Sequence, residues 1–144
     1  MAKGRFVLAR IGQTLVVTIE GTTDNATLSA AADMISETHA RQGAASVVFE
    51  VSGCEVMDLD EFVGLQKLVR TMELLGLRCV IAGLRPGIVA YLASAGISAG
   101  SLRTSLDLEL ALLELNPSRE QPETESEPES GFKPKYDPDN ARAF

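Results

Sequence analysis

The chain has 144 residues, of which 45% are hydrophobic, so its length and composition predict a single domain with a substantial apolar core. Acidic residues number 20 against 13 Lys and Arg, and the formal net charge of −7 disfavours binding to nucleic acid or to an anionic membrane, because both need a basic face. The sequence contains no apolar run long enough to span a bilayer, and its first residues lack the apolar core of a signal peptide. We therefore expect a cytoplasmic protein.

Strand-like and helix-like patterns alternate from the start of the chain. Residues 5–11 and 15–21 are expected to be strands, and the short turn between them makes a hairpin the simplest connection. A helix is expected next, because apolar residues recur with helical spacing over residues 28–35. Asp24 or Asn25 can cap the start of this helix with a side-chain oxygen.

The same alternation continues through the middle of the chain. Residues 46–51, SVVFEV, are apolar and β-branched and predict a buried strand. An amphipathic helix is expected over residues 62–75, closed by Gly76. Residues 77–83 predict another apolar strand, and Pro86 is well placed for the first turn of a further helix.

Residues 106–115, LDLELALLEL, fit two interpretations. The leucines alternate with other residues as in a strand, whereas the residue types favour a helix, and we choose the helix. Such a helix carries leucine on more than one face. The face formed by Leu108, Leu112 and Leu115 is expected to meet another subunit, and a more deeply buried helix is the alternative.

The composition changes after Asn116. Residues 117–144 are polar, acidic and interrupted by proline at their start, and such a segment cannot offset its ordering entropy by burial. We therefore expect a domain over residues 1–116 and a disordered tail over 117–144. The aromatic residues of the tail are candidates for a short docking motif, and a solvated extension without function is the alternative.

The order of these elements predicts an α/β fold. Strands that alternate with helices indicate a mixed, mainly parallel sheet of four to five strands with about four helices. The first hairpin would supply an antiparallel edge. The pattern does not decide whether the helices cover one face of the sheet or both.

Four acidic residues lie close together just before the second helix: Glu55, Asp58, Asp60 and Glu61. A calcium loop needs a longer pattern with a glycine at its sharp turn, and acid–base catalysis needs a pocket around paired carboxylates. Asp58 and Glu61 instead have the spacing of a capping box, and Asp60 adds negative charge where the helix dipole favours it. Helix capping therefore explains much of this charge.

Other kinds of catalytic, nucleotide-binding or metal site have little support in the sequence. No nucleotide-binding glycine motif and no nucleophile elbow is present. Two cysteines and a single histidine, His39, make neither a disulfide framework nor a zinc site. Cys79 lies in an apolar strand, whereas Cys54 lies in a loop where its thiol could be exposed but has no nearby His or Lys to lower its pKa. We predict no catalytic residue, no metal and no cofactor.

The stretch from VVFEV to SAGI, residues 47–97, resembles the STAS domain, the fold of anti-anti-sigma factors, and within that family the stressosome scaffold proteins. The resemblance rests on a loop that ends in Asp58, on LLGL at 74–77, on GLRP at 83–86 and on SAGI at 94–97. These pieces occur in the family's order, and the resemblance extends over about residues 5–115.

The resemblance implies a non-enzymatic protein that acts by partner switching in the regulation of transcription. Its partner would be a serine/threonine kinase-like anti-sigma protein or another STAS protein. In the family, phosphorylation of a Ser or Thr directly after the loop aspartate is the usual switch. Here that position holds Leu59, which has no hydroxyl. The docking surface is expected at Met57, Asp58, Leu59, Asp60, Glu61 and Phe62, with Leu59 as an exposed apolar residue at the start of the helix.

Several readings stay open at this point. The protein could bind its partner constitutively, or it could be a structural or decoy member that is regulated elsewhere. Ser52, Thr22 and Thr23 are other hydroxyls near the expected surface, and Gly87 replaces an acidic residue that is common in the scaffold proteins. A self-assembling structural subunit, forming a homo-oligomer, is one alternative function. An accessory domain of a transporter or of a lipid-trafficking system is another.

Overall fold

The computed structural model describes residues 4–97 and 102–116. The elements in chain order are β1 (Arg5–Ile11), β2 (Thr14–Glu20), α1 (Asn25–Gln42), β3 (Ser46–Gly53), α2 (Leu59–Leu74), β4 (Arg78–Ala82), α3 (Pro86–Ser94), β5 (Thr104–Ser105) and α4 (Leu108–Leu115). The chain divides into two compact units after Leu112, and the sheet with α1, α2 and α3 lies within the first. The predicted tail, residues 117–144, falls outside the described residues.

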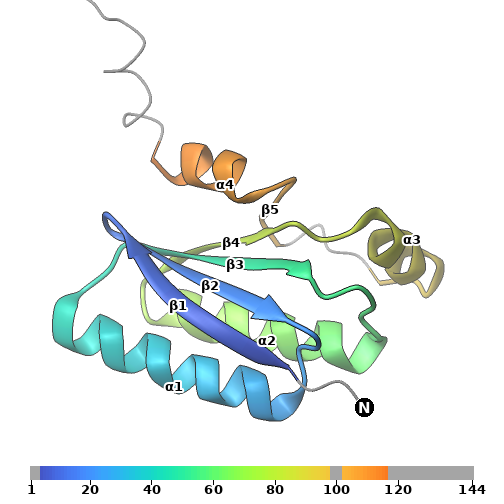
Figure 1. Cartoon of the computed structure of the whole chain (residues 1–144), viewed down its shortest axis with the longest axis horizontal. Helices are drawn as coiled ribbons and strands as arrows, with labels where there is room; N and C mark the ends of the chain where they lie inside the picture. The colour runs from blue at the N-terminus through green and yellow to red at the C-terminus, as the bar shows by residue number, and fades with distance from the viewer. Residues whose placement is uncertain (1–3, 98–101, 117–144) are drawn as a thin grey trace, which may run out of the picture. The chain divides into compact units, whose positions relative to one another are not determined.

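The five strands form one sheet in the order β1-β2-β3-β4-β5 (Figure 1). β1 pairs with β2 antiparallel as the predicted hairpin, from Arg5 opposite Glu20 to Ile11 opposite Thr14. The other neighbouring strands are parallel, so the sheet is mixed and mainly parallel with an antiparallel edge. The α/β fold class is confirmed. The fifth strand has two residues, which is too short to leave a periodic pattern in the sequence.

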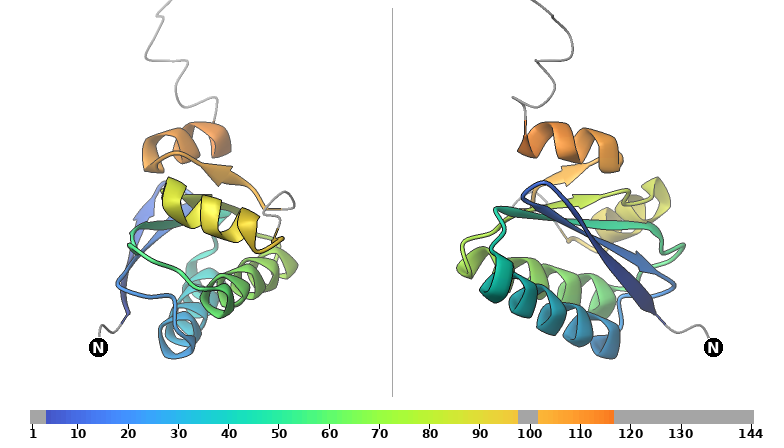
Figure 2. Two further views of the ribbon diagram at one scale, coloured as in Figure 1. Left: turned by 90° about the vertical axis from the view of Figure 1, so that its right-hand side faces the viewer. Right: turned by 60° about the vertical axis from the view of Figure 1, so that its left-hand side comes forward.

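Helices α1 and α2 lie side by side on one face of the sheet (Figures 1 and 2). The core fills the space between this face and the two helices, with side chains that alternate along each strand. Its largest fully buried side chains include Leu15, Ile35, Phe49, Phe62 and Leu65. The alternate strand residues Val16, Val48 and Val80 on the opposite face are also buried, which explains why residues 47–49 of β3 are apolar without a break.

Local capping signals fix where the helices begin. Asp24 caps α1, and its carboxylate accepts a hydrogen bond from the Thr27 amide at 2.8 Å. Pro86 is the first residue of α3, as predicted. α4 begins at Leu108, two residues later than its leucine pattern suggests, because the Asp107 carboxylate accepts the Leu110 amide (2.9 Å).

The leucines of the last helix differ in exposure from what the pattern suggested. Leu108 and Leu112 are half-buried and Leu115 is buried. The exposed leucines of this segment are Leu106, which precedes α4, and Leu110. Self-association stays a prediction, and a contact between copies would find more apolar surface at these two positions than at the three that the sequence favoured.

Candidate functional site

The carboxyl ends of β2, β3 and β4 meet at one edge of the sheet, shown at the right in Figure 1. The connections that follow these strands lead into α1, α2 and α3, so the three helix N-termini gather at this edge. The Gly21 amide donates to the Gly53 carbonyl at 3.2 Å and joins the first two connections. In parallel sheets this edge is where loops bring distant residues together to bind ligands and partners.

The start of α2 is held by the predicted capping box. The Asp58 carboxylate accepts the Glu61 amide at 2.8 Å, and the Glu61 carboxylate accepts the Asp58 amide at 2.9 Å. Asp60 is exposed in the first turn, where its negative charge complements the amide groups of the helix end. Two of the clustered carboxylates therefore have a structural role.

Glu61 also connects α2 to the loop between β2 and α1. Its second carboxylate oxygen accepts a hydrogen bond from the Thr22 hydroxyl. The Thr23 hydroxyl, which is buried, donates to the Glu61 carbonyl at 3.1 Å. Sequence reasoning named both threonines only as nearby hydroxyls. Their position directly after a strand that ends at the shared edge was the available signal.

Leu59 is the first helical residue of α2. We expected it to be exposed, but it is half-buried and packs against the core. Leu59 lies three residues before the buried Phe62, on the same face of α2, and this face packs on the core. Met57, just before the cap, is buried as well. The residues of the predicted surface that are well exposed are Asp58 and Asp60.

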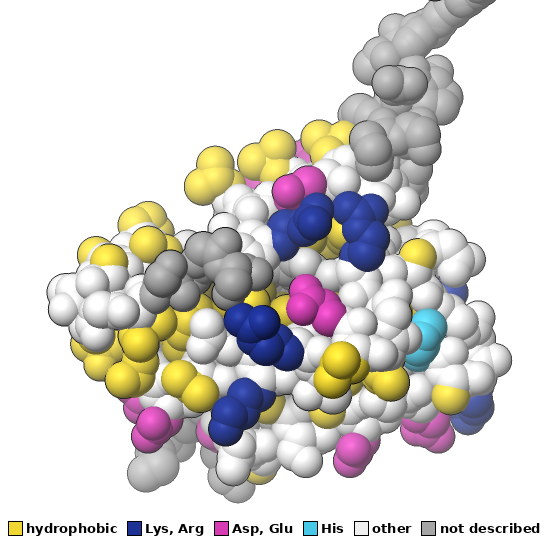
Figure 3. All heavy atoms as spheres, turned by 180° about the vertical axis from the view of Figure 1, so that it is seen from behind, with side chains coloured by type: hydrophobic (Ala, Val, Ile, Leu, Met, Phe, Trp, Pro, Cys, Tyr) yellow, Lys and Arg dark blue, Asp and Glu magenta, His cyan; other side chains and the backbone are white. Residues whose placement is uncertain are grey.

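A groove lies between the loop that precedes α2 and the start of α3. Its volume is about 450 Å³. The residues that line it are Glu55, Val56, Met57, Asp58, Glu61, Gly87, Ile88 and Tyr91. Figure 3 shows hydrophobic side chains gathered on the side of the molecule where α3 lies. Val56 is 76% exposed, and Val89 and Tyr91 on α3 are exposed too. The sequence did not single out Val89 or Tyr91.

The GLRP segment, residues 83–86, joins β4 to α3 and positions the start of α3, which forms one side of this groove. Gly83 has φ of +79°, and a Cβ atom there would approach the Glu50 carboxylate to 2.5 Å. Arg85 precedes the first residue of α3, and its Nε donates to the Ser52 carbonyl at 2.9 Å. These contacts hold the start of α3 against the end of β3.

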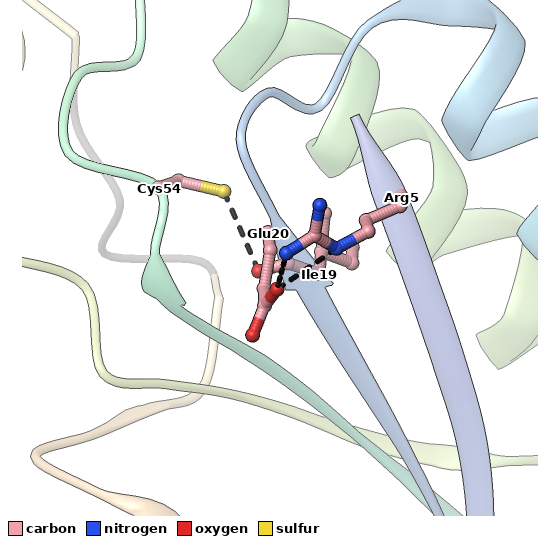
Figure 4. Close-up of polar contacts among 4 residues, drawn as sticks. All are labelled: Arg5, Ile19, Glu20 and Cys54. Carbon is pink, nitrogen blue, oxygen red and sulfur yellow. Dashed lines mark hydrogen bonds and ion pairs between the residues drawn. The ribbon is translucent and has the colours of Figure 1, made fainter. Parts of the chain in front are cut away.

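Both cysteine thiols are buried, which makes them poor candidates for nucleophiles or metal ligands. Cys54 lies in the loop after β3 but is fully buried, which contradicts the exposure that its loop position allowed. Its sulfur donates to the Ile19 carbonyl at 3.7 Å, beside the Arg5–Glu20 ion pair at 2.8 Å (Figure 4). Burial, with a smaller effect from Glu61, raises the pKa of Cys54 to about 11.

Cys79 is buried on β4, and burial raises its pKa to about 12. The part of the chain that the structure describes contains no group of three or more His, Cys, Asp or Glu side chains placed to hold a metal ion. Within residues 4–97 and 102–116, no helix combines the length and the apolar character needed to cross a membrane.

Comparison with known proteins gives one family match and several structural ones. The family described as the STAS domain matches residues 5–111. A structure of a variant of RsbS from Moorella thermoacetica shares 25% identity with a TM-score of 0.66, covering 81% of this chain and 99% of that chain. A search of curated protein sequences finds no match.

Two further solved structures share the fold. A chain from a structure of the molecular architecture of the stressosome, described as a signal integration and transduction hub, has 22% identity and a TM-score of 0.63, covering 80% of this chain and all (100%) of that chain. The anti-sigma factor antagonist SpoIIAA in its unphosphorylated form has 16% identity and a TM-score of 0.60, covering 78% of this chain and 96% of that chain.

Proposed function

Because the chain belongs to the STAS domain family, we propose that it is a non-enzymatic regulatory protein that binds a protein partner in a partner-switching pathway of the anti-sigma or stressosome type. The partner would be a serine/threonine kinase-like anti-sigma protein or another STAS protein. RsbS and the anti-sigma factor antagonist SpoIIAA are similar to this chain over most of their length, which supports this class of function.

The observation that carries the proposal is the surface at the start of α2. Asp58 and Asp60 are exposed there, Leu59 and Glu61 are half-buried, and Met57 and Phe62 are buried beneath them. We propose that the exposed and half-buried residues contact the partner. The buried pair supports their positions. An exposed carboxylate on a fixed helix end offers a partner both charge and a defined geometry.

Leu59 occupies the first helical position of α2 and carries no hydroxyl. We propose that this protein keeps the docking surface of its family without phosphorylation at this position. Its side chain packs against the core. Binding would then be constitutive, or it would be controlled elsewhere in the chain or in the partner.

Affinity capture from the native cell tests the proposal. The full chain would be tagged and compared with Asp60→Lys, which reverses the charge of an exposed residue in the first turn of α2. We expect the variant to lose a kinase-like or STAS partner that the wild type retains. Asp33→Lys makes the same change on the exposed side of α1 and serves as the matched control. Equal recovery of the partner by both variants would reject the surface.

Leu59→Ser addresses the missing switch directly. If the surface is of the family type, the restored hydroxyl becomes a substrate of the captured kinase-like partner, and phosphate appears on residue 59 by mass spectrometry. Wild-type protein should carry none at this position. If a captured partner binds but leaves Ser at position 59 unmodified, the partner docks on this protein without phosphorylating residue 59.

A further inference from the structure

We propose that the groove between residues 54–58 and α3 binds a partner segment with apolar side chains flanked by Lys or Arg. This inference rests on the proposed function and names the chemistry of its partner. The groove adjoins the start of α2, because Asp58 and Glu61 line it as well as forming the capping box. The groove adds a second binding feature, on the α3 side, to the surface at α2.

The floor and walls of the groove are apolar. Met57 and Ile88 form the floor and are almost completely buried, at 3% and 4% exposure. Val56 and Tyr91 rise on the two sides and are exposed at 76% and 48%. A partner that covers them removes apolar surface from water, and tyrosine is among the side chains enriched where proteins bind one another.

The rim of the groove is acidic. Glu55, Asp58 and Glu61 line it, and no Lys, Arg or His among the described residues does so. Glu55 is exposed and makes no hydrogen bond or ion pair within residues 4–97 and 102–116, so its carboxylate is available to an incoming cation. Arg85 lies two residues before Gly87 of the lining, but its side chain donates to the Ser52 carbonyl and does not line the groove. An acidic rim around an apolar floor complements basic residues around an apolar centre.

The size and openness of the groove indicate a polypeptide segment as its occupant. A volume of about 450 Å³ accommodates a few side chains. Small-molecule sites enclose most of their ligand, whereas the walls here are side chains that are themselves exposed, Val56 at 76% and Tyr91 at 48%. Segments that present apolar side chains on one side dock into open grooves of this kind.

Selection from a phage-displayed random peptide library against the immobilised full chain tests the inference. We expect enriched peptides to share an apolar centre flanked by Lys or Arg. A labelled synthetic copy of one such peptide would then be titrated by fluorescence anisotropy. Val56→Asp should weaken its binding by about tenfold or more, because it places a carboxylate on an apolar wall. Glu55→Lys should weaken binding by about fivefold or more and reduce its dependence on salt.

Val7→Asp is the matched control. Val7 is exposed at 66% on β1 and is not among the residues that line the groove. This variant should bind the peptide as the wild type does, and circular dichroism would show that all three variants keep the fold. Both Glu55 and Val56 are exposed, so neither substitution should disturb the core.

The proposal is overturned if selection yields no basic, apolar peptides, or if the selected peptide binds Val56→Asp as tightly as wild type. It is also overturned if sedimentation shows a dimer that Val56→Asp dissociates, because a second copy would then occupy the groove. None of these three results depends on Asp60, so the proposed function can stand or fail in the capture experiment independently of the peptide result.

Discussion

The carboxylate of Glu61 accepts the hydroxyl of Thr22, a residue 39 positions earlier in the chain. The same carboxylate closes the capping box of α2 by accepting the Asp58 amide. One side chain therefore fixes the start of α2 and joins it to the loop that leads into α1. The shape of the candidate docking surface depends on these two hydrogen bonds of Glu61.

Glu61→Ala should lower the free energy of unfolding by about 1–2 kcal/mol, because it removes one half of the capping box and leaves the Thr22 hydroxyl without its acceptor. Glu61→Gln keeps an oxygen for one of the two bonds and should cost less. Urea unfolding followed by circular dichroism measures both. Glu73→Ala, at the exposed far end of α2, is the control and should stay within about 0.5 kcal/mol. If Glu61→Ala lowers the free energy of unfolding no more than Glu73→Ala does, the Glu61 side chain does not stabilise the start of α2.

Gly83→Ala should destabilise the protein by about 1–3 kcal/mol, since residue 83 has positive φ and its new Cβ would meet Glu50 and Ser52. Gly87→Ala is the paired substitution in α3, where a Cβ finds nothing within 4 Å. It should be neutral or stabilising by up to about 1 kcal/mol, because alanine favours the helix. Thermal unfolding of the two variants distinguishes them, and equal midpoints would show that the turn at Gly83 is not constrained.

Leu59→Ser should cost about 1 kcal/mol, because the half-buried leucine packs against the core and serine does not. Leu74→Ser changes a leucine of the same helix that is 88% exposed, and it should shift stability by less than about 0.5 kcal/mol. Urea unfolding compares the two. If Leu59→Ser costs nothing, the side chain is not an anchor for the start of α2.

Stability should fall as the pH rises above about 9 because of the buried thiols. An unfolded chain loses a cysteine proton near the ordinary pKa of 9.0, whereas the folded chain keeps it until about 11 at Cys54 and about 12 at Cys79. Between these values the unfolded state binds fewer protons, so the free energy of unfolding decreases with pH.

The decrease from each thiol is at most about 1.4 kcal/mol per pH unit. The double variant Cys54→Ala/Cys79→Ala should show a shallower decline over the same pH range, even though it starts from a lower stability. Urea unfolding at a series of pH values measures the slopes. Identical slopes would show that the thiols ionise in the folded state as they do in the unfolded one.

Local signals in the sequence predicted much of the fold. The strands of the hairpin, the cap at Asp24 and the Asp58–Glu61 box are each encoded by residues a few positions apart, and all are present in the structure. The contact between Thr22 and Glu61 depends on the order of strands in the sheet, which a local pattern does not specify.

Exposure was harder to predict than secondary structure. The position of Leu59 after the cap indicated an exposed residue, but its side chain is half-buried and packs against the core. Val56 and Tyr91 are far apart in sequence and show no shared pattern, so the groove that they flank could not be anticipated. The two-residue β5 was missed because it has no period of its own.

The capping box also limits how the binding surface of this protein can diversify. Asp58 and Glu61 cannot change charge without weakening the start of α2, so their identity is tied to folding. Glu55, Val56 and Asp60 are exposed and are not part of the capping box. Related proteins that recognise different partners should therefore vary at these three positions and keep the other two, which separates the residues that set specificity from those that maintain the scaffold.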